Sequence, residues 1–167
     1  MITSGVCFPQ DTLQKVKVAK VLSGDRFITD NNIEVRLLGI KTPPSDDSLE
    51  IAELSERTGI KPDTIKILGG LCREFAENYL LGNEVQLIKD SYSTDTDTSG
   101  RLLRYVYLDD GTFFNKTLLL YGYAFVNSAE QDSFREARRF TDTMLYIKNY
   151  FLGLWINPNF RKLQAAY

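Results

Sequence analysis

The first forty residues alternate polar and apolar positions in short runs. In QKVKVAKVL, residues 14–22, the apolar Val16, Val18 and Val21 recur on one face, which is typical of a half-buried strand. The turn sequence SGD follows, and the runs RFITD and IEVRLLGI flank a second turn sequence, DNN. The pattern predicts a meander of three consecutive strands.

Two further strands are predicted in the second half of the chain. EVQLIKD and RLLRYVYLD have strand patterns, and the polar run SYSTDTDTSG between them has the composition of a loop. The predicted total is therefore five strands.

Helical periodicity appears between and after these strands. A helix is predicted in LGGLCREFAENYLLG, where Gly82 is placed to end it, and a short helix in FFNKTLLLYG, where Gly122 is the stop. The apolar positions of the first helix are Leu68, Leu71, Cys72, Phe75 and Tyr79. A last helix is predicted from about Asp132 to Leu152, with Trp155 against the core after it. Its predicted apolar side is Phe134, Ala137, Thr141, Met144, Leu145 and Leu152.

This order of elements predicts the fold class. Three strands, a helix, two strands and two helices indicate an α+β, mainly β, domain built on a five-stranded OB-fold barrel with three helices. The domain is expected over 14–157, after an N-terminal lead-in at 1–13 and before a C-terminal tail at 158–167. Residues 45–69 are polar and helix-prone, and they are expected to form an inserted helical flap.

Composition excludes several kinds of chemistry. The chain has 167 residues and no histidine, so histidine zinc sites, Ser-His-Asp triads and histidine general bases are excluded. Its two cysteines, Cys7 and Cys72, make neither a disulfide framework nor a metal cluster. The net charge of −2 offers no global attraction for nucleic acid, so such contacts must come from local groups. No apolar run approaches the roughly 20 residues that cross a membrane, and no feature indicates a compartment.

Several separated blocks resemble one known family. VLSGDRF, VRLLGIKTPP, FAENYLLGNEVQL, SGRLLRYVYLDDGTFFNKTLLLYGYAFV and the terminal helix ending at Trp155 together resemble the staphylococcal nuclease (thermonuclease) family. The resemblance covers about residues 14–157 except the insertion. It implies an OB-fold barrel with three helices and a nuclease that cleaves DNA and RNA with one calcium ion.

The resemblance also implies roles for particular residues. Asp25 matches a metal ligand, and Arg36 and Arg101 match the two arginines that contact the scissile phosphate. The family's Asp-Thr-Pro-Glu motif supplies a second metal ligand and the general base. Here those two positions hold Lys41 and Pro44, so both acids are replaced.

These replacements predict a degenerate active site. Calcium takes about six to eight oxygen ligands, and an ammonium group in place of a carboxylate opposes its binding. Proline cannot accept a proton, and a positioned general base is worth roughly 10²–10⁴-fold in rate. We therefore expect a protein that binds a phosphate-bearing ligand, nucleic acid or nucleotide, with little or no calcium-dependent hydrolysis. No cofactor is expected, or calcium if the protein is active, and Lys41 is expected to pair with Asp25 in place of the ion.

Other interpretations of these residues remain open. Arg36 could instead pair with Glu34 or Asp25 as an ordinary strand residue. Tyr92 and Tyr123 are the aromatic residues expected on a ligand face, although most of the other tyrosines and phenylalanines are needed in the core.

The insertion offers three alternatives. In the first alternative, one of its carboxylates restores hydrolysis as a metal ligand or base. The structural counterpart of this alternative is that these residues only cap a helix that starts near Ser48. The candidate carboxylates are Asp46, Asp47, Glu50 and Glu53. The segment IAELSERTGIKPDTIK also resembles a helix-turn-helix, with Lys61 and Lys66 as the cations of its second helix. A protein partner that binds the 45–69 insertion is the third alternative.

Overall fold

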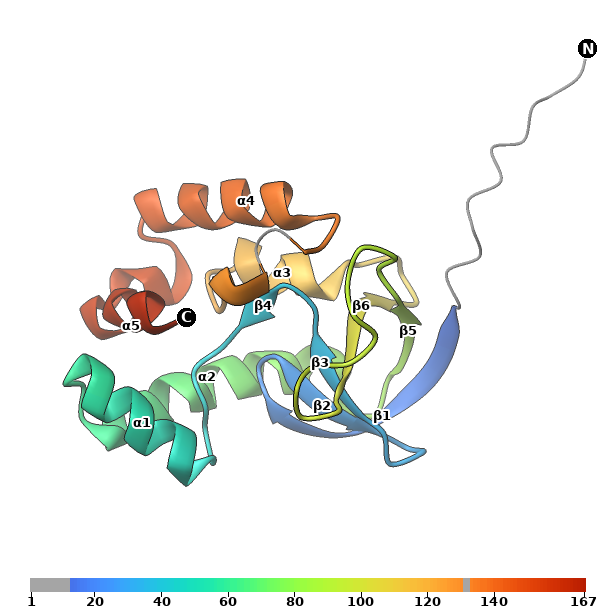
Figure 1. Ribbon diagram of the computed structural model, residues 1–167, viewed down its shortest axis with the longest axis horizontal. Helices are drawn as coiled ribbons and strands as arrows, with labels where there is room; N and C mark the ends of the chain where they lie inside the picture. Colours follow the sequence, from blue (N-terminus) through green and yellow to red (C-terminus); the bar gives the residue numbers. More distant parts are fainter. Residues whose placement is uncertain (1–12, 131–132) are drawn as a thin grey trace, which may run out of the picture.

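The structure, a computed structural model, describes residues 13–130 and 133–167. Five strands close into a barrel in the order β1-β2-β3-β6-β5 (Figure 1). The barrel strands are β1 (Gln14–Ser23), β2 (Arg26–Thr29), β3 (Glu34–Leu37), β5 (Glu84–Ile88) and β6 (Leu102–Leu108). The β3–β6 pairing is parallel and the other pairings are antiparallel. The predicted α+β OB-fold barrel is confirmed, and the alternating valines Val16, Val18 and Val21 of β1 are buried.

The third predicted strand is divided in two. β3 ends at Leu37, and Gly39 turns the chain with φ +79° before β4 (Ile40–Lys41) pairs antiparallel with β7 (Phe125–Val126) outside the barrel. A Cβ at Gly39 would lie 2.5 Å from the ring of Phe134, so the turn needs glycine for space as well as for its dihedral angle. The break separates the strand that carries Arg36 from the strand that carries Lys41.

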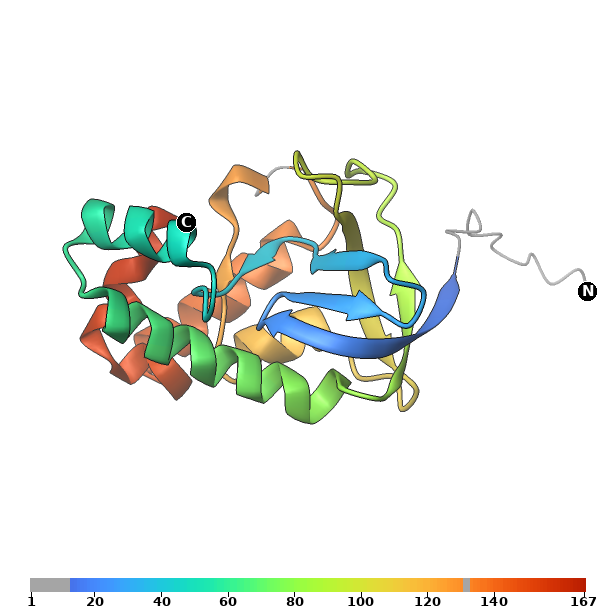
Figure 2. The same cartoon turned by 90° about the horizontal axis from the view of Figure 1, so that it is seen from below.

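The insertion forms one helix and the first turns of another. α1 (Ser48–Thr58) begins at Asp47, whose carboxylate accepts a hydrogen bond from the Glu50 backbone N–H, so the capping interpretation is confirmed for this residue. The next helix, α2 (Pro62–Leu80), begins earlier than predicted, because a proline is well tolerated at the first helical position. The second half of the helix-turn-helix resemblance is therefore the start of α2. Figure 2 shows α2 lying across the barrel beside β1.

The predicted apolar side of the last long helix is partly wrong. α4 (Ala137–Asn149) buries Phe140, Met144 and Ile147, whereas Leu145 and Leu152 are both exposed. The buried set repeats every three or four residues from Phe140, which rotates the buried face away from Leu145. The predicted start at Asp132 lies outside the described residues.

The last ten residues, set apart as a tail by the sequence, pack onto the domain. They form α5 (Pro158–Leu163) and the short helix η3 (Gln164–Ala166), and Phe160 and Leu163 are fully buried. Trp155, in η2 (Gly153–Ile156), is also fully buried, as predicted, with its ring edge-on to Phe125 and Phe160. The remaining helices are α3 (Phe114–Leu120) and η1 (Ser128–Glu130). None of the helices in the described part of the chain is long and apolar enough to cross a membrane.

Candidate functional site

An open cleft of about 600 Å³ lies between β3, the β5–β6 loop at 89–101 and η1. Its lining includes four of the residues that the sequence analysis selected: Arg36, Lys41, Tyr92 and Arg101. The loop lies beside the end of β3 in both views (Figures 1 and 2). The cleft therefore brings these four side chains together from β3, β4 and the loop.

The two arginines converge on one carboxylate. Arg36 Nε donates to Asp97 Oδ2 at 3.1 Å, and Arg101 Nε donates to the same oxygen at 2.7 Å. The side chains of Arg36 and Asp97 are only 4% and 8% exposed, so water screens this contact little. The structure therefore places Arg36 and Arg101 side by side, as the resemblance implies.

A second carboxylate completes the surroundings of Arg36. Glu130 forms an ion pair with Arg36 Nη2 through one oxygen, and its other oxygen accepts the Gly39 backbone N–H at 3.0 Å. The Nη1 atom of Arg36 is buried and has no hydrogen-bond partner among the described residues. Pairing of Arg36 with Glu34 or Asp25 is thus wrong, because Asp97 and Glu130 take those places.

Hydrogen bonds set the charge state of Asp97. Burial raises the pKa of its carboxyl, but hydrogen bonds from the Arg101 backbone and side chain lower it by more, so the net pKa lies below the usual range. The Ser99 and Arg101 backbone N–H groups donate to Asp97 Oδ1 at 2.9 and 3.0 Å. The Asp97 carboxylate is accordingly ionised at neutral pH and holds the loop as well as the arginines.

Replacing Asp97 with asparagine is expected to lower the free energy of unfolding at pH 7 by roughly 1.5–3 kcal/mol. A carboxyl with a depressed folded-state pKa contributes stability above its unfolded pKa of about 4, and this contribution is lost as pH falls through the folded-state pKa. The difference in the free energy of unfolding between wild type and Asp97→Asn should therefore disappear in acid. Urea unfolding between pH 7 and pH 3 measures this difference.

Asp95 provides the matched control for this experiment. It pairs with Arg104 at 2.8 Å, but its side chain is 50% exposed. Asp95→Asn should cost less at pH 7 than Asp97→Asn, because solvent screens exposed pairs. Equal costs for the two variants would contradict the role assigned to Asp97.

Asp25 is not among the residues that line the cleft. Its side chain is buried, and Oδ1 accepts hydrogen bonds from the Ser23 and Thr42 hydroxyls at 2.7 and 2.9 Å. The predicted pair between Lys41 and Asp25 is wrong, because Lys41 forms no ion pair within the described part of the chain and its side chain lines the cleft. The break at Gly39 places Lys41 on β4, where it pairs with Phe125 of β7.

The loop at the expected base position packs on a helix. Pro43 and Pro44 are buried, and a Cβ at Gly69 of α2 would lie 2.1 Å from the Pro44 carbonyl oxygen. This contact places the backbone of α2 directly against the loop. The insertion therefore covers the position where the family carries its general base.

The four insertion carboxylates have different surroundings. Asp46 forms an ion pair with Arg73, Asp47 caps α1, and Glu53 is exposed. Glu50 is half-buried, and burial raises its pKa. The positive charge of Lys41 lowers that pKa, and the negative charge of Asp25 raises it. Glu50 is therefore close enough to Lys41 and Asp25 to feel both charges.

The C-terminal residue Tyr167 lies near the charges of Glu50 and Asp25. The Tyr167 ring stacks on Phe125 with centroids 5.4 Å apart, and its hydroxyl oxygen is buried. Burial raises the pKa of this hydroxyl, and the negative charges of Glu50 and Asp25 raise it further. The Arg57 guanidinium also donates to the Ala166 carbonyl, which links α1 to the same segment.

The two tyrosines selected from the sequence lie in different places. Tyr92 stands at the cleft with its side chain exposed, and the Arg135 guanidinium lies 5.6 Å from the centre of its ring. Tyr123 lies outside the cleft, stacked on Phe75 with ring centroids 4.4 Å apart. Tyr92 is therefore part of the cleft and Tyr123 is not.

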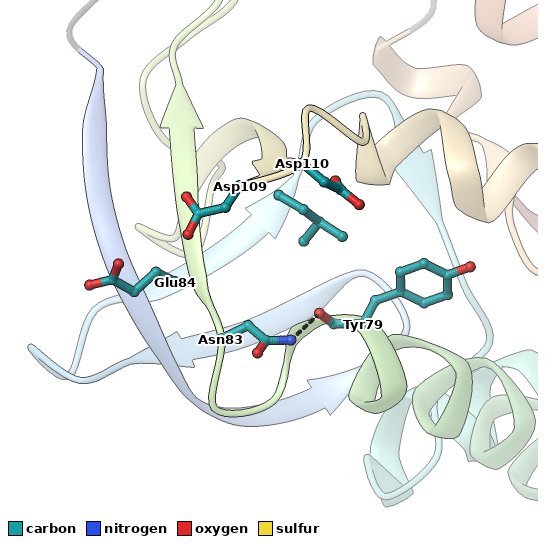
Figure 3. A pocket seen from close by; sticks show the side chains of 6 residues that line it. Tyr79, Asn83, Glu84, Asp109 and Asp110 are labelled. Atoms are coloured by element: carbon teal, nitrogen blue, oxygen red, sulfur yellow. Dashed lines mark hydrogen bonds between the residues drawn. The ribbon is translucent and has the colours of Figure 1, made fainter.

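The acidic side chains among the described residues are the groups that could hold a metal ion. The described residues contain no group of three or more His, Cys, Asp or Glu side chains placed to hold a metal. A second pocket, of about 250 Å³, gathers Glu84, Asp109 and Asp110 near Tyr79 and Asn83 (Figure 3). Lys15 lies 3.2 Å from the carboxylates of both Glu84 and Asp109, so a cation of the protein itself partly neutralises this pocket.

Sequence reasoning missed Asp97 and Glu130. Asp97 lies four residues before Arg101 in the loop, and its only sequence signal is a polar turn that ends in Gly-Arg. Glu130 comes from η1, and no pattern connects it to β3.

Comparison with known proteins identifies the family of the chain but does not bear on individual site residues. A family model described as staphylococcal nuclease homologue matches residues 34–157, more than half of the chain. The match includes the β3 strand, the insertion, the cleft loop and α4. No curated protein matches the chain.

Proposed function

Because the chain belongs to the staphylococcal nuclease family, we propose that it binds a phosphate-bearing ligand, a nucleic acid or nucleotide, in the cleft. Arg36, Lys41 and Arg101 contact the phosphate, and Tyr92 offers an aromatic face to a base. Calcium-dependent hydrolysis of phosphodiesters is weak or absent.

The observation that carries this proposal is the convergence of Arg36 and Arg101 on the Asp97 carboxylate. Guanidinium groups that can bind a carboxylate can also bind phosphate oxygens, which present similar acceptors. The buried Nη1 of Arg36 has no partner among the described residues, and an unpaired buried donor costs free energy. A phosphate oxygen would recover that free energy once neighbouring side chains move aside to admit it. Lys41 adds a third positive charge to the same cleft.

The surroundings of the missing acids support the loss of hydrolysis. Asp25 is buried under its own hydroxyl donors, Lys41 replaces the second metal ligand, and Pro44 packs on α2 where the base would stand. A metal ion would therefore lack one of its two carboxylate ligands, and a metal-bound water would lack its base.

Replacing Arg101 with alanine is expected to weaken binding of thymidine 3′,5′-bisphosphate by about 1.5–3 kcal/mol, or roughly 10- to 150-fold. Arg101 is preferred to Arg36 for this test because its side chain is 20% exposed and its removal disturbs the core less. Isothermal titration calorimetry measures the affinity.

Arg138→Ala is the control for this titration. Arg138 lies on α4 with its side chain 95% exposed and is not among the lining residues, so this variant removes one positive charge from outside the cleft. It should bind the bisphosphate as wild type does. If Arg101→Ala also binds as wild type, the arginines are structural, and the interpretation of the insertion as a protein-binding module takes precedence.

A nuclease that uses Glu50 is the second candidate function. A half-buried carboxyl with a raised pKa, close to a vacated base position, has the property that a general base needs. Incubation of the protein with denatured DNA, with calcium and with chelator, tests this candidate. Cleavage that requires calcium and is lost in Glu50→Gln would favour it over the degenerate site.

A further inference from the structure

The outward face of α4 is unusual for a helix on a protein surface. Phe140, Met144 and Ile147 face the core, and the opposite side is expected to be polar. The first part of that side carries charge, because the side chains of Arg138 and Arg139 are 95% and 77% exposed. Each arginine also has an acidic neighbour, since Arg138 lies 4.0 Å from the Asp142 carboxylate and Arg139 lies 3.3 Å from the Glu136 carboxylate. Its last part carries Tyr146 and Tyr150, which are 58% and 64% exposed and whose ring centroids lie 4.7 Å apart.

The beginning of α4 is joined to the cleft. Ser133 lines the cleft, and Arg135 lies over the ring of Tyr92 and donates to the Ser91 hydroxyl at 3.2 Å. α4 runs from Ala137 to Asn149, over which a helix advances about 1.5 Å per residue, or roughly 18 Å. In Figure 1, α4 runs from the cleft loops along the outside of the molecule to the end that carries α5. The chain that leads from the cleft lining therefore continues directly into the helix that carries the arginines and the tyrosine pair.

The charge of this surface differs from that of the chain. Residues 133–150 contain four Lys and Arg against two Asp and Glu, whereas the whole chain has a net charge of −2. Residues 143–167 contain no acidic residue at all. A partner that fits this surface is anionic and carries flat groups that can stack on aromatic rings.

We infer that the α4 face is a binding track for single-stranded nucleic acid that continues from the cleft. Arg138 and Arg139 contact backbone phosphates, and the Tyr146–Tyr150 pair stacks on bases further along the strand. Cationic grooves with aromatic stacking platforms bind single strands in this way, over roughly 4–16 nucleotides for one OB-fold. This inference rests on the proposed binding of a phosphate-bearing ligand in the cleft and extends it from one nucleotide to a strand.

Two labelled oligothymidylates, about 3 and about 15 nucleotides long, test the track by fluorescence anisotropy. The short probe reaches only the cleft, and the long probe spans the cleft and α4. Wild type should bind the long probe more tightly, and Tyr146→Ala/Tyr150→Ala should weaken the long probe roughly tenfold or more without affecting the short one. Both tyrosines are exposed, so the double variant should fold as wild type does.

The arginines have a separate readout, which is the salt dependence of binding. Each phosphate contact to a single strand contributes about 0.7 to the slope of log affinity against log salt, so Arg138→Ala/Arg139→Ala should reduce the slope for the long probe by about 1.4. Lys61→Ala/Lys66→Ala removes the same charge from the start of α2 and should leave the slope unchanged.

Three results would overturn the track. The first is equal affinity of the wild type for the two probes. The second is that Tyr146→Ala/Tyr150→Ala binds the long probe as tightly as wild type does. The third is that wild type binds vesicles of anionic phospholipid, and that the double variant loses this binding while it keeps oligonucleotide binding. The cleft is tested separately by the short probe and Arg101→Ala. If the short probe does not bind but the tyrosines still govern the long probe, the track stands and the proposed function fails.

Discussion

Replacing Arg36 with methionine is expected to lower the free energy of unfolding by about 3–5 kcal/mol. The substitution removes the ion-pair partner of Glu130, whose side chain is 15% exposed, and one of the two guanidinium partners of Asp97, whose side chain is 8% exposed and which keeps Arg101. Buried charges without a partner are costly because water no longer solvates them. Urea denaturation at neutral pH measures the change.

Two comparisons separate this effect from simple loss of packing. Arg36→Met/Glu130→Gln should recover part of the loss, because the carboxylate that is left without an ion-pair partner is removed together with the arginine. Arg101→Met should cost less than Arg36→Met, because Arg101 is the more exposed of the two. A cost below about 1 kcal/mol for Arg36→Met would show that the pairs behave like exposed ones.

Gly69→Ala is expected to lower the free energy of unfolding by about 1–3 kcal/mol. The added Cβ would lie 2.1 Å from the Pro44 carbonyl oxygen and 2.8 Å from the Pro43 carbonyl oxygen, so the loop must move away from α2. Both contacts are with backbone atoms, which cannot swing aside as a flexible side chain can. Thermal or chemical unfolding measures the loss.

The neighbouring Gly70 offers a matched control in the same helix. A Cβ at Gly70 meets nothing within 4 Å, and alanine favours a helix over glycine by about 1 kcal/mol. Gly70→Ala should therefore stabilise the protein while Gly69→Ala destabilises it. The same sign for both variants would show that α2 does not press on the Pro43-Pro44 loop.

The strands of the barrel could be predicted because alternation is a local signal. Val16, Val18 and Val21 repeat with period two and are buried in β1. The break at Gly39 could not be predicted, because it depends on the ring of Phe134, which comes from a distant part of the chain. The buried face of α4 could not be predicted either, because it depends on the elements that α4 contacts, which are α3, β7 and η2.

The candidate site divides in a similar way. Arg36 and Arg101 were predicted because each belongs to a recognisable motif. Their acidic partners were not, because Asp97 lies 61 and Glu130 94 positions from Arg36 in the sequence, and only the folded chain joins them. The pairing of Lys41 with Asp25 failed for the same reason, since it assumed that one strand continues through Gly39.

A calorimetric titration of the wild-type protein with thymidine 3′,5′-bisphosphate, once with chelator and once with excess calcium, tests the central claim most directly. A phosphate site built from arginine and lysine needs no ion, so we expect saturable binding with chelator and the same affinity with calcium. Binding that requires calcium would contradict the degenerate site, and no binding under either condition would contradict the phosphate-binding cleft.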